Sequence, residues 1–358
     1  MERRSFLKHS GLAGILAAGS APAFAQAPTI KWRCASSFPK SLDTIYGAAE
    51  TAAKALAEAT GGRFQIQVFA GGEIVPGLQV ADAVQNGTVE CGHTAPYYYI
   101  GKDPTFAFGT AIPFGLNQRQ FDAWWYFGQG REPYNEFLKE YNIHSVLCGN
   151  TGAQMGGWYR KEIKSVADLK GLKMRIGGFA GQVLAKLGLV PQQLAGGDIY
   201  PALEKGTIDA AEWVGPYDDE KLGFDKVAKH YYYPAFWEPG SFSHFFVNKD
   251  EWAKLPKEYQ AAFEVASYEA AAKMIAAYDT KNPAALARLL QKGVKLQKFP
   301  DEVMQAGYKA AFQIYNDEAA TNPDFKKIFT EYDKFRRSSN AWFSVAEMNI
   351  DRFLQNAK

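Results

Sequence analysis

Charges of the two signs are almost balanced in this chain, and long apolar runs are missing. The 358 residues hold 40 Lys and Arg against 38 Asp and Glu, a formal net charge of +2. Such a balance lacks the basic excess that nucleic acids and anionic membrane surfaces attract, so we exclude both as partners. After the first 25 residues, no apolar run is long enough to span a bilayer.

Cysteine and histidine are scarce as well. The cysteines are Cys34, Cys91 and Cys148, each inside a strand-like segment, and none has the C-x-x-C spacing of a zinc or redox motif. In an exported protein two of them can form a disulfide and leave one thiol free, or all three can be small buried hydrophobes. The histidines are scattered without the spacing of metal ligands.

The sequence motifs of several large enzyme classes are missing too. There is no G-x-x-x-x-G-K-[ST] loop, no G-x-G-x-x-G between a strand and a helix, no G-x-S-x-G elbow and no H-E-x-x-H. Nothing in the motif content argues for turnover, so we expect a binding protein and not an enzyme.

The first 25 residues have the pattern of a removable export leader. Arg3, Arg4 and Lys8 give a basic start, a modest apolar centre follows, and AFA ending at Ala25 is a small-x-small cleavage site. RRSFLK also matches the twin-arginine export pattern, although a chance basic leader for the general secretory route has the same appearance. We expect a mature, soluble protein that begins near Gln26 and works in the periplasm.

Residues 26–150 alternate strand-like and helix-like segments. TIKWRCAS and RFQIQVFA have the period of two that is typical of strands, and the alanine-rich segment between them has helical spacing and ends at a Gly-Gly pair. VADAVQNG and VECGHTA continue the alternation. This order predicts a wound, mainly parallel α/β sheet.

The chain is long enough for two lobes. Without the leader, 333 of the 358 residues remain, more than one hydrophobic core usually serves. We assign lobe I to 26–150 with a return segment at about 240–300, and lobe II to 151–239. Several hinge strands between two such lobes predict an α/β clamshell with wound mixed sheets. Residues 301–358 predict further long helices at the carboxyl end.

Two ionisable residues stand where short strands of the second lobe should end. Arg175 closes the apolar run of SVADLKGLKMRIGG, and Glu212 closes that of LEKGTIDAAEWVGPY. Open α/β sheets bind ligands at strand ends, where a guanidinium offers a planar fork to a carboxylate and a carboxylate offers oxygens to a hard cation. The pair predicts capture of a small acid, although an ordinary structural ion pair has the same spacing.

Other residues are candidates for the cavity wall. Asn150 stands at the crossing between the lobes and can donate to a substrate oxygen. Tyr97 and Tyr98 follow a first-lobe strand in HTAPYYY, which places them at the cleft rim, and Trp213 follows Glu212. Tyr and Trp line an apolar pocket and still offer a donor. Which tyrosine of 97–99 faces the cleft stays open.

The stretch around Arg175 and Glu212 also carries a resemblance to a known family. DLKGLKMR at 168–175 and LEKGTIDAAEW at 203–213 resemble the DctP-like solute-binding subunits of tripartite ATP-independent periplasmic (TRAP) transporters. The likeness extends over the chain after the leader, because the amino-terminal strand, GGEIVPGLQVADAVQNGTVE and NKDEW occur in the expected order. The Glu-Trp pair is similar to the branch that binds 2-oxo or 2-hydroxy monocarboxylates (α-keto acids) and not to the sialic-acid branch.

The resemblance implies roles for single residues. Arg175 matches the family's carboxylate-binding arginine, while Gln154, Glu212 and the backbone carbonyl of Trp213 match the ligands of a metal ion that bridges protein and substrate. Such an ion would chelate the carboxylate and the adjacent 2-position oxygen together. With one carboxylate among the ligands we expect sodium rather than calcium; a metal-free, hydrogen-bonded pocket is the alternative.

The resemblance also implies a periplasmic-binding-protein fold and two partners. One is the pair of TRAP membrane permease subunits. The other is a second copy of the chain, joined as a homodimer through an exchanged helix within 301–358; the alternative is that these helices pack along the protein's own back.

Together these observations predict a periplasmic protein that captures a pyruvate-like acid and delivers it to a permease. Three alternatives stay open. The chain could be an exported metal-dependent enzyme acting on small organic acids, with Glu212 as its base. It could bind a bulkier acid or a polyol, or it could be a sensory subunit that docks on a receptor.

Overall fold

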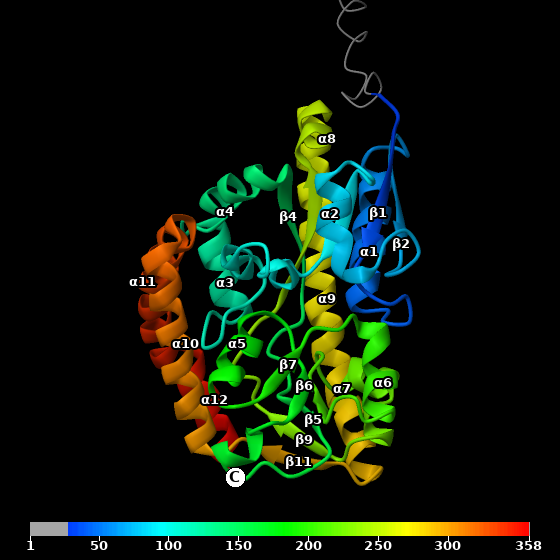
Figure 1. Ribbon diagram of the computed structural model, residues 1–358. Coiled ribbons are helices and arrows are strands. Elements are labelled where there is room, and N and C mark those ends of the chain that lie inside the picture. The colour runs from blue at the N-terminus through cyan, green and yellow to red at the C-terminus, as the bar shows by residue number, and fades with distance from the viewer. Residues whose placement is uncertain (1–27, 358) are drawn as a thin grey trace, which may run out of the picture.

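The computed structural model describes residues 28–357, whose strands form two separate sheets (Figure 1). One sheet has the order β2-β1-β3-β10-β4 and the other the order β11-β9-β5-β8-β6-β7. The first lies in the upper lobe of Figure 1 and the second in the lower lobe. This is the two-lobed α/β architecture with mixed sheets that the sequence predicts. The leader expected at 1–25 lies outside the described residues.

The first sheet joins strands from two distant parts of the chain. Its strands are β1 (Ile30–Ser36), β2 (Phe64–Phe69), β3 (Cys91–Thr94), β4 (Ile143–Asn150) and β10 (Phe242–Asn248). β1 pairs in parallel with β2 and β3, whereas β10 is antiparallel to β3 and β4. The parallel crossovers are made by α1 (Ile45–Ala59) and α2 (Val80–Gln85), whose alanines and valines form the buried face.

The segment between β3 and β4 is an aromatic layer beside this sheet. It contains α3 (Gln118–Tyr126), α4 (Arg131–Leu138) and short 3₁₀ turns at Pro96–Tyr99, Pro104–Gly109 and Lys139–Tyr141. Asn117 and Gln120 form a capping box that starts α3. Trp124 and Trp125 are buried, and Phe121 stacks on Phe242 of β10. The three rings of α3 are part of the core, and Phe242 also lines the cavity between the lobes.

The second sheet carries the strand ends that the sequence singles out. Its strands are β5 (Gly157–Tyr159), β6 (Lys173–Arg175), β7 (Val190–Gln192), β8 (Ala210–Ala211), β9 (His230–Tyr233) and β11 (Lys295–Lys298). β7, β6 and β8 are parallel neighbours, joined by α5 (Gly178–Lys186) and α6 (Gly196–Glu204). α7 (Pro216–Leu222) follows β8. Parallel strands end at one edge, which faces the first lobe (Figure 1).

Two chain segments cross between the lobes side by side. One runs from β4 to β5 and the other from β9 to β10. The amide of Thr151 donates to the carbonyl of Ser241 at 3.0 Å, and the amide of Gln154 donates to the carbonyl of Glu238 at 3.0 Å. The paired crossings are the hinge expected of a clamshell.

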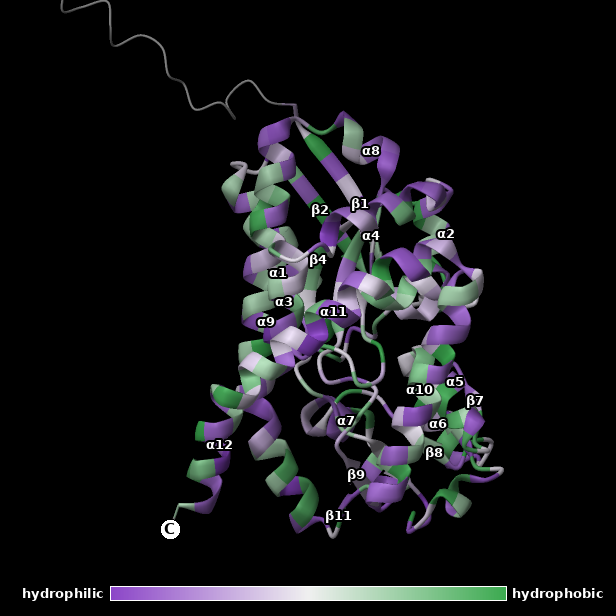
Figure 2. Ribbon diagram, turned by 90° about the vertical axis from the view of Figure 1, so that its left-hand side faces the viewer, coloured by the Kyte–Doolittle hydropathy of each residue, from purple (hydrophilic) through white to green (hydrophobic). Residues whose placement is uncertain are grey.

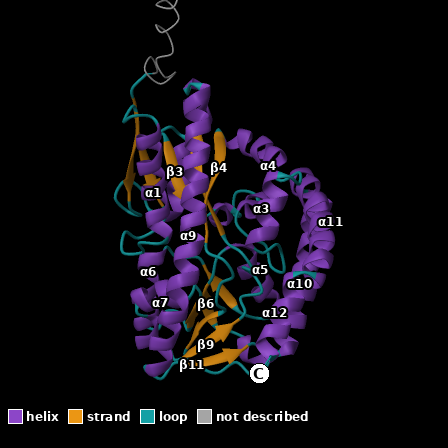
Figure 3. Ribbon diagram, turned by 180° about the vertical axis from the view of Figure 1, so that it is seen from behind, coloured by secondary structure: helices purple, strands orange, loops and turns teal. Residues whose placement is uncertain are grey.

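One long helix connects the two lobes a third time. After α8 (Lys249–Lys254), α9 (Lys257–Gln291) has 35 residues, about 50 Å of helix, and contacts α1 and β4 of the first lobe and α7 of the second. In Figure 3 it runs the length of the molecule. It delivers the chain to β11, which pairs with β9 in the second sheet. The end of the 240–300 return segment therefore lies with the second sheet.

The carboxyl-terminal helices flank both lobes. They are α10 (Asp301–Thr321), α11 (Pro323–Val345) and α12 (Glu347–Asn356). α10 contacts α5 of the second lobe, and α11 contacts α3 and α4 of the first. α12 contacts α11, contains no buried residue and lies at the edge of the molecule (Figure 2).

The structure also bears on two questions from the sequence, namely membrane-spanning helices and the pairing of the cysteines. Within residues 28–357, no helix combines the length and apolar character needed to cross a membrane. Cys34, Cys91 and Cys148 are all buried with free thiols, as small hydrophobes would be.

Candidate functional site

Arg175 is the last residue of β6 and is fully buried. Its Nη1 donates to the backbone carbonyl of Glu212 at 2.7 Å and to Glu212 Oε2 at 3.2 Å, and its Nε donates to the carbonyl of Leu194 at 3.2 Å. β6 and β8 run in parallel with Arg175 opposite Ala211, so Glu212 emerges beside it at the same sheet edge. The two predicted strand-end residues therefore meet.

Burial governs the electrostatics of this pair. Burial alone would lower the pKa of Arg175, but Glu212 raises it, so the guanidinium stays charged. Burial and the nearby Glu238 raise the pKa of Glu212 well above its usual range, against the opposing effect of Arg175. One guanidinium thus lies near two buried carboxyl groups, and a cation bound between them would favour their ionised forms.

Trp213 covers the guanidinium. Arg175 Cζ lies 4.9 Å from the centroid of the Trp213 ring, a cation–π contact. The ring packs against Gly196 at the start of α6, where a Cβ would stand 2.6 Å from the indole. Glycine at 196 therefore lets the indole sit flat beside the arginine.

Gln154 and Asn150 lie in the first of the two crossings. Gln154 Nε2 donates to Thr151 Oγ1 at 3.1 Å, which leaves Gln154 Oε1 for another partner. The Asn150 Oδ1 accepts from the amide of Gly152 at 2.5 Å. Gln154 lines the cavity described below, whereas Asn150, although 3% exposed, is not one of its lining residues.

Tyr97 and Tyr98 both face the cavity, and Tyr99 does not. The rings of Tyr97 and Tyr98 stack at 5.0 Å, and both residues line the cavity. Burial raises the pKa of Tyr98 to about 12 and that of Tyr97 well above its usual range, so both hydroxyls remain protonated donors. The Tyr99 hydroxyl lies within the first lobe, 2.9 Å from Thr94 Oγ1.

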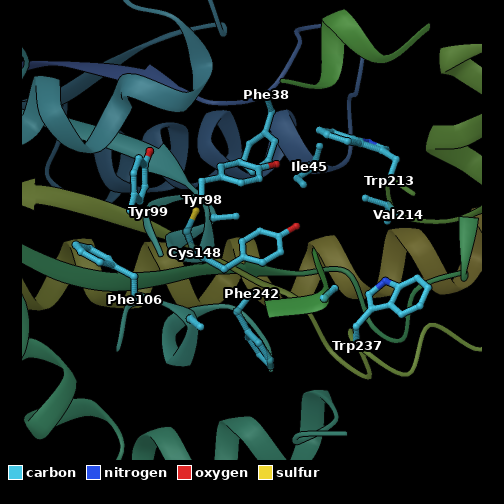
Figure 4. Packing of buried hydrophobic residues seen from close by; sticks show 14 of the residues in the cluster. Phe38, Ile45, Tyr98, Tyr99, Phe106, Cys148, Trp213, Val214, Trp237 and Phe242 are labelled. Atoms are coloured by element: carbon cyan, nitrogen blue, oxygen red, sulfur yellow. The ribbon is translucent and has the colours of Figure 1, made fainter. Parts of the chain in front are cut away.

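A small cavity lies between the lobes, walled by residues of both. It has a volume of about 20 Å³ for the centre of a water molecule, which is room for about one or two waters. Figure 4 shows Phe38, Ile45 and Tyr98 of the first lobe on one side and Trp213 and Val214 of the second on the other. Thr151, Gln154 and Ser241 bring polar groups from the crossings.

Gln154 and Trp213 line this cavity, whereas Arg175, Glu212 and Asn150 lie next to lining residues without lining it themselves. Polar atoms of these residues are buried yet lack hydrogen-bond partners within residues 28–357. The donors are Arg175 Nη2, Asn150 Nδ2 and Trp213 Nε1, and the acceptors are Gln154 Oε1 and Glu212 Oε1. Burial raises the pKa of the neighbouring Glu238 to about 7, against hydrogen bonds from Ser241 and Tyr97. Buried polar groups are almost always paired, so these atoms call for a ligand. The donors suit a carboxylate, and the acceptors, all oxygens, suit a hard cation. The chemistry of the predicted metal ligands therefore fits a cation such as sodium or calcium.

Part of this site has no clear signature in the sequence. Glu238, Ser241 and Phe242 come from the return crossing, and Met274 comes from the long helix α9. The crossing has no periodicity and α9 presents many apolar residues, so neither pattern marks its cavity-facing positions. The one available signal was a lone acid, Glu238, among Phe, Trp and Pro.

Comparison with known proteins shows which family this chain belongs to. Residues 35–322 match the family described as DctP, bacterial extracellular solute-binding protein, family 7. The chain is 52% identical over 331 residues to the monocarboxylate 2-oxoacid-binding periplasmic protein of Nostoc sp., covering 92% of this chain and 91% of that protein.

Two solved structures are similar over the same span. A TRAP transporter solute-binding protein from Bordetella bronchiseptica, a mixed-occupancy dimer with copurified calcium and picolinate, is 54% identical with a TM-score of 0.91, covering 92% of this chain and 98% of that one. One from Pseudoalteromonas atlantica with bound sodium and pyruvate is 37% identical with a TM-score of 0.88, covering 92% and 100%. The chain belongs to the DctP family of extracellular solute-binding proteins that serve TRAP transporters.

Proposed function

We propose that this protein captures a small 2-oxo or 2-hydroxy monocarboxylate, with pyruvate as the reference ligand, together with a bridging cation. The observation that carries the proposal is the set of buried, unpartnered donors and oxygen acceptors around one cavity. The relatives named for 2-oxoacids, or solved with pyruvate and sodium or with picolinate and calcium, support it.

Arg175 would bind the carboxylate of the acid. Its Nη1 and Nε are held by Glu212 and Leu194, which fixes the guanidinium plane and leaves Nη2 for the ligand. Trp213 closes one face of that plane. A guanidinium that is already oriented loses little side-chain entropy when the acid binds.

Gln154, Glu212 and the Trp213 carbonyl would hold the cation. When bound, the cation would supply a positive charge that joins the carboxylate to the 2-position oxygen and selects for that oxygen. A set with one carboxylate favours sodium, and the preference depends on which further carboxylates reach the ion.

The size of the cavity favours a small acid over the bulkier acid or polyol considered from the sequence. The closed cavity has room for about one or two water molecules, so even pyruvate, with six non-hydrogen atoms, enters only after the lobes move apart, and a bulkier solute would require a larger movement. The family is one of solute-binding proteins, and we propose binding without turnover, followed by delivery to membrane permease subunits. Residues 1–25 would direct export to the periplasm.

We further propose that the protein is a homodimer joined through α12. Its apolar residues Met348, Ile350, Phe353 and Leu354 are 50–66% exposed, and the helix buries none of its residues within this chain. The similar Bordetella protein was solved as a dimer. Light scattering should give twice the chain mass, and removal of residues 347–358 should give one chain mass; a monomeric full-length protein would contradict the proposal.

Thermal unfolding with a panel of acids tests the ligand class. Pyruvate and its 2-hydroxy analogue lactate, each with sodium or calcium, should raise the unfolding midpoint, because a ligand that binds the folded state stabilises it. Propionate, which lacks the 2-position oxygen, should leave the midpoint unchanged. Equal stabilisation by propionate would show that this oxygen is not recognised. NMR of the incubated acid should show unchanged pyruvate; any product would support the enzyme alternative.

A further inference from the structure

The two sides of the cavity differ in chemistry. Among its lining residues, the polar atoms without a hydrogen-bond partner in residues 28–357 are Gln154 Oε1 and Trp213 Nε1. Both lie on the side of the second lobe. The Trp213 ring covers Arg175, and the amide of Met155, which follows Gln154, donates to the carbonyl of Val214 at 3.0 Å. The polar head of a bound acid therefore belongs on this side.

The opposite wall comes from the first lobe and from α9, and it presents mainly apolar side chains. Phe38, Ile45 and Met274 line it and are 1–5% exposed (Figure 4 shows the first two). Ser243 is a polar residue of this wall, but its Oγ already has a partner, His93 Nε2, at 3.2 Å. An acid whose carboxylate points towards the second lobe therefore directs its tail to an apolar wall.

Met274 is the part of that wall that can move. A Cβ added at Gly149 of β4 would collide with its Sδ, so the thioether lies in a recess that the glycine leaves. The Phe38 ring packs edge-on against the Trp213 ring at 6.4 Å, and Ile45 is branched at Cβ, so both are stiff. Methionine is unbranched with three rotatable bonds and adapts to irregular space.

We infer that Met274 determines how long a tail the site accepts, and that the site takes short unbranched aliphatic 2-oxo acids as well as pyruvate. The inference rests on the proposed function. With the head held beside Arg175, each further methylene extends the tail towards α9. One methylene against an apolar pocket typically changes binding by about 10- to 200-fold. Truncation of Met274 should therefore change the preference for chain length.

A series of acids of increasing length tests the inference. Pyruvate, 2-oxobutyrate, 2-oxovalerate and 2-oxohexanoate are titrated by calorimetry into wild type and Met274→Ala, in calcium and separately in sodium. The wild type should bind 2-oxohexanoate more weakly than pyruvate. In Met274→Ala, which lacks the thioether and its methyl group, the ratio of the Kd for 2-oxohexanoate to that for pyruvate should fall by about tenfold or more.

The control is another methionine outside the cavity. Met304 on α10 is partly buried against the core and does not line the cavity, so Met304→Ala should keep the wild-type ratio. The ratio compares two ligands in one variant, so a loss of stability that affects both equally does not change it.

A second variant and a structure keep the test independent of the fold of Met274→Ala. Met274→Leu keeps a similar volume on a stiffer, branched side chain. It should bind pyruvate as the wild type does and 2-oxovalerate about threefold or more weaker. In crystals of the wild type with 2-oxovalerate, the terminal carbon should lie within about 4.5 Å of a Met274 side-chain atom.

The contradicting outcomes differ for the two claims. A wild-type ratio in Met274→Ala, equal affinity of Met274→Leu and wild type for 2-oxovalerate, or a terminal carbon beyond about 6 Å from Met274 would overturn the role of this residue. Failure of the proposed function would appear instead as a wild type that binds none of the four acids with either cation.

Discussion

Asp43 ties the lobes together at a site outside the cavity, and its loss should weaken ligand binding. It lies in the first lobe and forms ion pairs with Lys221 of α7 and with Lys281 of α9, the latter at 3.1 Å. The Tyr217 hydroxyl of α7 donates to both of its carboxylate oxygens, at 3.0 and 3.1 Å. Because both lobes wall the cavity, an acid enters only when the lobes separate, and these contacts re-form on closure.

The contribution of these ion pairs to the free energy of closure follows from the solvent exposure of the Asp43 carboxylate and the two lysines. The Asp43 side chain is 52% exposed and the two lysines are 31% and 35% exposed, so each pair is screened by water and contributes about 0.2–1 kcal/mol. Asp43→Asn removes both ion pairs and keeps an acceptor for Tyr217. We expect closure to lose about 0.4–2 kcal/mol, which raises the Kd for the acid about 2- to 30-fold.

The control is an ion pair of the same kind that stays within one lobe. Asp82 pairs with Lys102 inside the first lobe with similar exposure, so Asp82→Asn should leave the Kd unchanged. Calorimetry with pyruvate measures both variants. Raising the salt from about 50 to 500 mM should narrow the difference between wild type and Asp43→Asn. Equal Kd values for the two variants would refute the reasoning.

The pH dependence of this contact has a definite sign. Burial raises the pKa of Asp43, but hydrogen bonds from Lys221, Lys281 and Tyr217 outweigh it and hold the pKa at about 2, below the ordinary 3.8. A lowered pKa in the closed form means that the contribution is complete above about pH 4 and is lost as the pH falls towards 2. The difference between wild type and Asp43→Asn should therefore be constant from about pH 5 to 8.

Three further predictions concern the site and its surroundings. Arg175→Ala should abolish acid binding, and Arg175→Lys, which keeps the charge without the fork, should restore only part of it; calorimetric affinity near wild type in the alanine variant would remove Arg175 from the site. Gly178→Ala should weaken acid binding by about tenfold or more, because the added Cβ would stand 2.3 Å from the Tyr97 ring across the lobe interface. Gly61 has the same φ of 58° but open space around it, so Gly61→Ala should lower only the stability of the fold. Burial lowers the pKa of His93 and of His244 to about 3, so their imidazole NMR signals should not titrate between about pH 8 and 5; a midpoint above about 6 would contradict this.

The sequence correctly predicts those site residues whose positions follow from regular secondary structure. Arg175 and Glu212 end parallel neighbouring strands, so strand-end reasoning is enough to bring them together. Tyr97 and Tyr98 follow β3 on a short turn and reach the cavity for the same reason. Asn150 also ends a strand, but its side-chain oxygen accepts a hydrogen bond from the amide of Gly152, and the residue does not line the cavity.

The remaining features depend on long-range packing. Glu238 lies in an irregular crossing, and only the backbone pairing with Gln154 places it beside this proposed cation ligand. β11 joins the second sheet because α9 is long enough to span both lobes. Helical periodicity predicts the helix but not which lobe its end reaches. Asp43 contacts residues of α7 that lie more than 170 positions away in the sequence. No local sequence pattern therefore predicts this contact between the lobes.

Calorimetric titration of chelator-treated protein with pyruvate, with and without added calcium or sodium, tests most directly whether a cation bridges the protein and the acid. We predict one-to-one binding that requires a cation, because Arg175 would hold the carboxylate while the ion would join it to the 2-position oxygen. Binding of equal strength without any cation would contradict the bridging ion. Absence of binding under every condition would contradict the 2-oxo acid as ligand.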